Sequence, residues 1–160
     1  MPSAGEGVIK RVGIASDHGG YPLKVELMPW LQAEGFDVVD LGAHELDPLD
    51  DYPDFADAAA QAIVSGQVER AIVFCGSGAG ASIAANKVPG VRAAVCHDTY
   101  SAHQAVEHDD MNVICIGARV IGAEVARELI TAFLNAQLLD GEKYHRRLKK
   151  VAAIEQRSLK

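Results

Sequence analysis

The residues with the clearest chemical potential lie between positions 71 and 87, in the segment AIVFCGSGAGASIAANK. A short apolar run ends at Cys75, a glycine-rich turn follows from Gly76 to Gly80, and a helix-forming run extends from Ala81 to Lys87. This order predicts a buried strand, a tight turn and the start of a helix. Such a turn directs backbone N–H groups and the positive end of a helix at one point, which favours an anion. A cysteine at that point can act as a base or a nucleophile.

The glycine spacing by itself leaves two interpretations open. It fits neither the GxGxxG dinucleotide fingerprint nor the phosphate-binding loop, because no Gly-Lys-Ser or Gly-Lys-Thr follows. A glycine turn can also be purely structural and let a helix pack close to a strand. The choice between an anion site and a packing turn needs the rest of the chain.

Strand and helix patterns alternate along the sequence. Apolar runs predict five strands, at 8–15, 36–41, 71–75, 91–96 and 113–117. Helical patterns occur at 22–32, 54–64, 81–87, 99–107, 122–134 and 142–156. Pro29, inside the first of these helices, predicts a kink or an early end. The alternation predicts an α/β fold, a three-layer α/β/α sandwich with a five-stranded, parallel, Rossmann-like sheet.

Polar clusters follow four of the five predicted strands. They are Asp17-His18, Cys75 to Ser77, His97-Asp98, and Arg119. In parallel sheets of this kind the ligand lies beyond the carboxyl ends of the strands. Because those ends meet at one edge, we expect the four clusters to face a shared site.

Composition narrows the class of protein. The 160 residues are 49% hydrophobic and 23% charged, and we expect one domain over 1–160 with a short disordered lead at 1–7. The net charge of −7 argues against general nucleic-acid binding. No apolar run reaches the roughly 20 residues of a membrane span, and the polar start does not resemble a signal peptide. Three cysteines without close pairs predict a reducing, cytoplasmic location. No metal-ligand spacing and no nucleotide fingerprint are present, so we expect no metal and no cofactor.

Three separated motifs together resemble the ribose-5-phosphate isomerase B family, which also contains galactose- and allose-6-phosphate isomerases. The motifs are SDHGG, CGSGAGASIAANK and HDDMNVICIGAR, and the resemblance extends from about residue 12 to residue 156. It implies an aldose–ketose isomerase that interconverts D-ribose 5-phosphate and D-ribulose 5-phosphate through a cis-enediolate. Two alternatives stay open: another sugar phosphate (a galactose, allose or tetrulose phosphate), and a phosphosugar-binding module without activity.

The resemblance assigns the proton transfer to Cys75, as the base that moves a proton between C1 and C2. Part of the family has a glutamate one turn later, but Ala81 stands there in this chain. Ser77 resembles part of an oxyanion hole for the enediolate. The N–H groups expected beside it belong to Gly76, Gly78, Ala79 and Gly80. The structural alternatives are a buried apolar cysteine and a serine that bonds its own turn.

His108 resembles the histidine that opens the sugar ring, which usually comes from the neighbouring subunit. Asp17 is its expected partner, to hold the sugar or share the ring-opening proton. A histidine at a helix end can instead cap the helix dipole. Asp109 follows, where most relatives have asparagine, and a carboxylate directed at the enediolate would be unfavourable there.

The resemblance also implies a homodimer with shared sites, with a tetramer left open, in which the C-terminal helix reaches the partner. Tyr144 stands where the family usually has an arginine, and a solvated basic helix is the structural alternative for this tail. Asn86 fits either a ligand or a helix C-cap. The residues assigned to sugar or phosphate are His18, Tyr52, Asp109, Arg119, His145 and Arg147.

Overall fold

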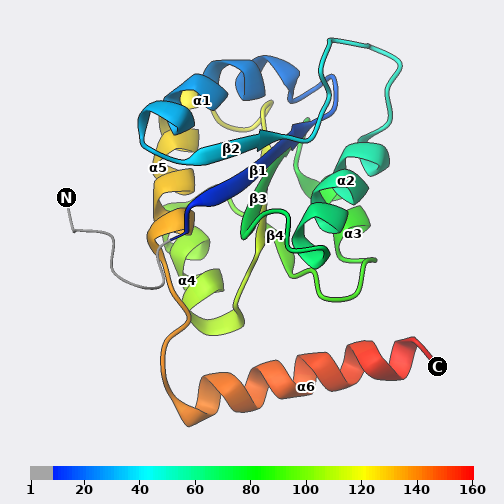
Figure 1. Ribbon diagram of the computed structural model, residues 1–160, viewed down its shortest axis with the longest axis vertical. Coiled ribbons are helices and arrows are strands. Elements are labelled where there is room, and N and C mark those ends of the chain that lie inside the picture. The colour runs from blue at the N-terminus through cyan, green and yellow to red at the C-terminus, as the bar shows by residue number, and fades with distance from the viewer. Residues whose placement is uncertain (1–8) are drawn as a thin grey trace.

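The computed structural model describes residues 9–160, and its five strands form one parallel sheet (Figure 1). The strands are β1 (Arg11–Ser16), β2 (Asp37–Asp40), β3 (Arg70–Cys75), β4 (Ala93–Val95) and β5 (Val113–Gly117). Their order in the sheet is β2-β1-β3-β5-β4, so β3 is central. The helices of the described range are α1 (Tyr21–Ala33), α2 (Tyr52–Val64), α3 (Ala79–Ala85), α4 (Thr99–Asp109), α5 (Ala123–Asn135) and α6 (Glu142–Ser158). The disorder predicted for residues 1–7 lies outside the described residues, as does residue 8.

Helices cover both faces of the sheet, and each face has its own apolar core. Helices α1, α4 and α5 supply one core, and the alanine-rich α2 and α3 supply the other. Successive side chains of a strand point to opposite faces. Ile72 and Phe74 of β3 therefore enter the first core, whereas Val73 and Cys75 enter the second. The predicted three-layer α/β/α fold is confirmed, and Cys75 belongs to the side covered by α2 and α3.

Of the two effects predicted at Pro29, a kink or an early end, the early end is wrong, because α1 continues to Ala33. Pro29 and Val25, the residue four positions earlier, are both exposed. The carbonyl group that proline leaves without a helical partner therefore lies toward solvent. Leu27 and Leu31 are fully buried on the inner side and hold the helix on the sheet.

Asn86 has a structural role at the end of α3. It occupies the C-cap position, and its side-chain amide exchanges two hydrogen bonds of 2.8 Å with the backbone of Ala93. Ala93 belongs to β4, the outermost strand on that side of the sheet. The amide therefore covers part of an open sheet edge, which supports the capping interpretation of Asn86.

Two glycines let the loops at the carboxyl edge of the sheet touch through backbone atoms. A Cβ added to Gly20 would lie 2.4 Å from the carbonyl oxygen of Phe74. A Cβ added to Gly117 would lie 2.6 Å from the backbone of Ser77. The loops that follow β1, β3 and β5 are therefore packed together without intervening side chains.

The last helix, α6, lies apart from the three layers (Figure 1), and none of its residues is buried. The segment that leads into α6 starts at the end of α5, which is held in place by a buried side chain. Buried Arg70 donates hydrogen bonds to the carbonyl oxygen of Phe133 and, at 2.8 Å, to that of Ala136. These carbonyls at the end of α5 would otherwise lack helical partners. No helix within residues 9–160 combines the length and apolar character needed to cross a membrane.

Gly20→Ala is expected to destabilise the protein by about 1–3 kcal/mol, because the new methyl group overlaps the backbone of Phe74. The melting temperature should fall by roughly 2–4 °C per kcal/mol, measured by thermal unfolding. Gly122→Ala is the matched control, since a Cβ there meets nothing within 4 Å. Equal melting temperatures for the two variants would contradict the close approach.

Candidate active site

A pocket of about 370 Å³ opens at the carboxyl edge of the sheet, beside the end of β3. The loops after β1, β3 and β5 form it together with the start of α2. The lining residues are Asp17, Tyr52, Cys75, Gly76, Ser77, Gly80, Arg119 and Val120. All of these except Val120 are residues that the sequence analysis selects, and Val120 is the apolar neighbour of Arg119. The structure therefore brings the predicted base, a carboxylate and a cation to one cavity.

Cys75 is held at the inner end of this pocket. Its Sγ accepts the N–H of Gly78 at 2.9 Å, and the side chain is only 5% exposed. Gly78 has a φ of 85°, a left-handed conformation that glycine adopts without strain. The thiolate is the form of a cysteine that can act as a base, and the N–H of Gly78 is a hydrogen-bond donor that the sulfur accepts. Ala81 is fully buried in α3, so that helix provides no carboxylate at this position.

Ser77 makes the hydrogen bond that its structural interpretation predicts, and this bond leaves the oxyanion-hole interpretation open. Its hydroxyl oxygen accepts the N–H of Ala79 at 3.2 Å, as in a serine that bonds its own turn. A hydroxyl can accept and donate at once, so its hydrogen can still reach a ligand in the pocket. The N–H groups of Gly78 and Ala79 are thus engaged with Cys75 and Ser77. The oxyanion hole stays a prediction, and these two donors serve the turn itself.

Asp17, Arg119 and Tyr52 form the other walls of the pocket. Asp17 is 8% exposed, and its Oδ1 accepts the N–H of Gly20 at 3.0 Å, which closes the turn after β1. Arg119 is exposed, and its side chain passes over Gly76. The ring of Tyr52 lies 2.8 Å from the position of a Cβ on Gly80, so any side chain at Gly80 would displace the ring.

His18 lies next to Asp17 and is paired with a residue that the sequence analysis does not select. Asp50 Oδ1 accepts the backbone N–H of His18 at 2.9 Å and lies 2.7 Å from its Nδ1. The hydrogen bond to Asp50 raises the pKa of His18, and the charges of Asp50 and Asp17 act in the same direction. Burial of His18 opposes this only in part. The second oxygen of Asp50 is buried without a protein partner.

The His97-Asp98 cluster, expected at the shared site, stabilises the fold instead. His97 Nε2 accepts the N–H of Gly117 at 2.8 Å, which ties the end of β4 to the end of β5. Asp98 accepts the N–H of Ser101 at 2.7 Å and caps α4. That bond lowers the pKa of Asp98. Neither residue is among those that line the pocket.

His108 lies at the opposite end of the molecule from Cys75. Helix α4 starts after Asp98 at the carboxyl edge of the sheet and runs back along the strands. His108 is ten residues further on, about 15 Å along the helix axis at 1.5 Å per residue. The side chain stacks on Tyr144 of α6 with 4.8 Å between ring centres. Within one chain, His108 and Cys75 do not share a pocket.

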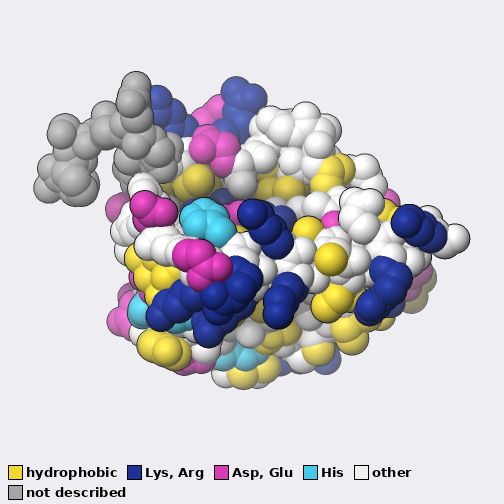
Figure 2. All heavy atoms as spheres, turned by 90° about the horizontal axis from the view of Figure 1, so that it is seen from below, with side chains coloured by type: hydrophobic (Ala, Val, Ile, Leu, Met, Phe, Trp, Pro, Cys, Tyr) yellow, Lys and Arg dark blue, Asp and Glu magenta, His cyan; other side chains and the backbone are white. Residues whose placement is uncertain are grey.

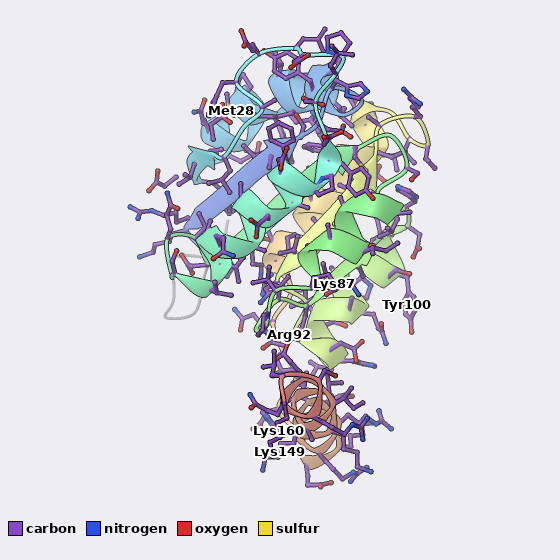
Figure 3. All side chains as sticks on the ribbon, turned by 90° about the vertical axis from the view of Figure 1, so that its right-hand side faces the viewer. Met28, Lys87, Arg92, Tyr100, Lys149 and Lys160 are labelled. Carbon is purple, nitrogen blue, oxygen red and sulfur yellow. The ribbon has the colours of Figure 1, made fainter. Side chains whose placement is uncertain are left out.

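Asp109, the last residue of α4, and the predicted tail residues on α6 lie at the same distant end. Asp109 and Arg147 are exposed. His145 lines a second cavity of about 340 Å³ between α6 and the base of the sheet, together with Arg92 and Lys149. Figure 3 shows α6 end-on below the body with Lys149 on it, and Arg92 at the base of the body. Basic side chains gather over α6 (Figure 2).

Within residues 9–160, no group of three or more His, Cys, Asp or Glu side chains is arranged to hold a metal ion. The two remaining cysteines are not placed for chemistry. Cys96 and Cys115 are almost fully buried. Burial raises the pKa of Cys96 to about 11 and raises the pKa of Cys115 further. Both behave as small core residues, as the sequence indicates.

Comparison with known proteins shows which family has this fold. Residues 12–151 match the family model described as Ribose/Galactose Isomerase. The chain is 40% identical to ribose-5-phosphate isomerase B of Escherichia coli over 149 residues, which covers 93% of this chain and 99% of the relative. It is 44% identical to D-erythrulose-4-phosphate isomerase of Pectobacterium atrosepticum over 133 residues, which covers 81% and 86%.

A solved structure gives the same result. The structure of ribose-5-phosphate isomerase B from Clostridium thermocellum superposes with a TM-score of 0.88 and 44% identity, and covers 92% of this chain and 99% of that one. The chain therefore belongs to the ribose/galactose isomerase family, whose members are isomerases of sugar phosphates.

Asp50→Asn is expected to lower the pKa of His18 toward 6.5, because the hydrogen bond to Asp50 is the main cause of its rise. A raised folded-state pKa stabilises the protein below the unfolded pKa, and the contribution is lost as pH rises through the folded one. The stability difference between parent and variant should therefore narrow with rising pH. An NMR titration of the imidazole signals measures the titration midpoint of His18, with His103, paired with Glu107, as internal control. An unchanged His18 midpoint would contradict the assignment.

Proposed function

We propose that this sugar-phosphate isomerase interconverts D-ribose 5-phosphate and D-ribulose 5-phosphate, as a single domain over residues 1–160 in the cytoplasm. The observation that carries the proposal is the environment of Cys75. Its sulfur accepts a hydrogen bond of 2.9 Å from the N–H of Gly78, in a pocket that Asp17 and Arg119 also line. A binding module would use the cation and the glycine turn, but it has no need of a buried base.

In the proposed reaction, the Cys75 thiolate takes the proton from C2 of the open-chain aldose. The C2–H electron pair forms the C1–C2 double bond of a cis-enediolate, and the carbonyl pair moves to O1. A proton passes from O2 to O1, with Ser77 as relay, and the carbonyl forms at C2 as the thiol returns its proton to C1. The proposed route relies on protein donors near O1 and O2, and such donors can stabilise an enediolate without a metal ion.

The phosphate group is proposed to bind between Arg119 and His18. A guanidinium offers two parallel N–H donors that match phosphate oxygens. The raised pKa of His18 favours the imidazolium form, which would add a second positive charge near the pocket. Asp50 occupies Nδ1 of that imidazole, so Nε2 is the nitrogen that is left to bind the anion.

A homodimer with shared sites is proposed as the working unit. His108 lies about 15 Å along α4 from the pocket edge of its own chain, so it can serve only the site of another copy. Helix α6 has no buried residue, and it exposes Val151 and Ile154 over about half of their surfaces (52% and 54%). An apolar helix face of this kind is typical of an interface. A second copy seated on it would bring His108, His145 and Arg147 toward a partner's Cys75.

A tetrulose phosphate is the second candidate substrate. It is favoured by the relative named D-erythrulose-4-phosphate isomerase, which is 44% identical over 133 residues. The chain departs from the family pattern at Asp109 and Tyr144, where that pattern has asparagine and arginine. These departures also bear on which sugar phosphate is the substrate. Galactose and allose 6-phosphates stay further alternatives.

Cys75→Ala is expected to reduce isomerisation of ribose 5-phosphate by at least about 100-fold, since the variant lacks the base. The assay follows ribulose 5-phosphate formation with EDTA present. Cys96→Ala is the matched control, because Cys96 directly follows β4 and belongs to the other core, and it should stay active. Turnover by the parent of tetrose but not pentose phosphate would move the assignment to the second candidate. A fully active Cys75→Ala would place the base elsewhere.

Subunit mixing tests the shared site. Cys75→Ala and His108→Ala should each be inactive alone, but the mixed dimer has one site with both residues intact. Random reassortment gives half heterodimers with one working site of two, so about a quarter of parental activity should return. Mixing Cys75→Ala with a Cys75→Ala, Ser77→Ala double variant is the control and should restore nothing. No recovery in the first mixture would show that the two residues act within one chain or not at all.

A further inference from the structure

The imidazole of His108 is held by two neighbours that have no assigned role. Gln104 lies one helical turn earlier on α4, and its Nε2 is 2.9 Å from Nδ1 of His108. Tyr144 of α6 covers the ring, with 4.8 Å between ring centres and 38° between the planes. All three side chains are half-buried, so their arrangement is set by packing between α4 and the start of α6.

We infer that Gln104 is a positioning residue that places the proton of neutral His108 on Nε2, and that this device serves substrates that are closed rings. An amide nitrogen can only donate, so Nδ1 of His108 must accept. A neutral imidazole carries a single N–H, which is then on Nε2. The nitrogen that points away from Gln104 is therefore a proton donor.

The nearby carboxylates do not compete for this ring. Glu107 Oε2 lies 3.1 Å from Nδ1 of His103, and Asp110 is paired with Arg92 at 3.1 Å. Asp109 is exposed. Lys143 lies over the outer ring, that of Tyr144, at 4.9 Å from its centre. The bond that decides the tautomer of His108 is thus the one from Gln104.

The inference rests on the proposed function, in which His108 opens the ring. In a furanose 5-phosphate, opening breaks the C1–O4 bond. O4 keeps the electron pair and takes a proton from Nε2 of His108, while a base such as Asp17 removes the proton of O1 and the C1 carbonyl forms. One proton enters and one leaves, so the step is balanced. It requires a donor on Nε2, which is what Gln104 provides.

The requirement depends on the chemistry of the substrate. Ribose 5-phosphate closes through O4, but ribulose 5-phosphate cannot form a furanose because O5 carries the phosphate. Tetrose 4-phosphates are open for the same reason, since O4 is esterified. A chain that acted on open substrates alone would need no proton donor for a ring oxygen. The Gln104–His108 pair therefore favours a cyclic aldose phosphate as the substrate class.

The experiment compares Gln104→Leu and Gln104→Glu with the parent in two assays. The first follows conversion of ribose 5-phosphate, which needs ring opening. The second follows deuterium exchange from D₂O into C1 of ribulose 5-phosphate, which needs Cys75 but no ring. Gln61→Leu is the matched control, because Gln61 is exposed on α2 and donates to Asp57 one turn earlier. ¹⁵N NMR of the imidazole reports the tautomer directly.

We expect Gln104→Leu to lose about tenfold or more in conversion, as for a weakened general acid, with exchange within about twofold of the parent. Gln104→Glu should lose more, because a carboxylate accepts a hydrogen bond from Nδ1–H and thereby favours the reversed tautomer. Equal losses in both assays, or none in either, would overturn the inference. A parent that shows neither conversion nor exchange would overturn the proposed function instead. An Nδ1–H tautomer in the parent would refute the role of Gln104 whatever the activity.

Discussion

The backbone contacts at the end of β3 are the constraint on which the site depends. Gly20 lies against Phe74 and Gly117 against Ser77, at separations that leave no room for a Cβ. The loops that carry Asp17 and Arg119 are therefore set relative to Cys75 by main-chain contact. Main-chain atoms have no rotamers to lose, so the relative positions of these loops do not depend on ordering side chains. Such preorganisation is what stabilises developing charge in a transition state.

The same sheet geometry divides the machinery between two ends of the chain. A helix that returns from a parallel strand must run antiparallel to it, so the start of α4 lies at the pocket and its end lies at the base of the sheet. Arg70 then fixes the end of α5 by binding the carbonyls of Phe133 and Ala136. Together these contacts hold His108 and the start of α6 in one place, away from Cys75. In the proposed reaction, a complete site consequently requires a second copy.

Sequence patterns predict the pocket well where position follows from strand direction. Cys75 ends a parallel strand, and Asp17 and Arg119 closely follow two others, so the three residues meet at one edge. His97 and Asp98 also follow a parallel strand. However, His97 accepts a hydrogen bond from the backbone of Gly117, and Asp98 caps a helix. Residue type cannot separate these outcomes, because both uses need the same donors and acceptors. Asp50 escapes sequence reasoning for a different reason: it lies 32 positions from His18, in the loop between β2 and α2, and that loop has no periodicity.

Two histidines of this chain show how the partner of one ring nitrogen sets the use of the other. His18 has the carboxylate of Asp50 at Nδ1, 2.7 Å away, and that partner raises the pKa of His18 and favours a cation suited to phosphate. His108 has the uncharged amide of Gln104 at the same atom, 2.9 Å away. An amide nitrogen brings no negative charge and can only donate, from which we infer that the single proton of a neutral ring lies on the far nitrogen. Under the proposed function, the same side chain thus holds an anion in one place and delivers a proton in the other.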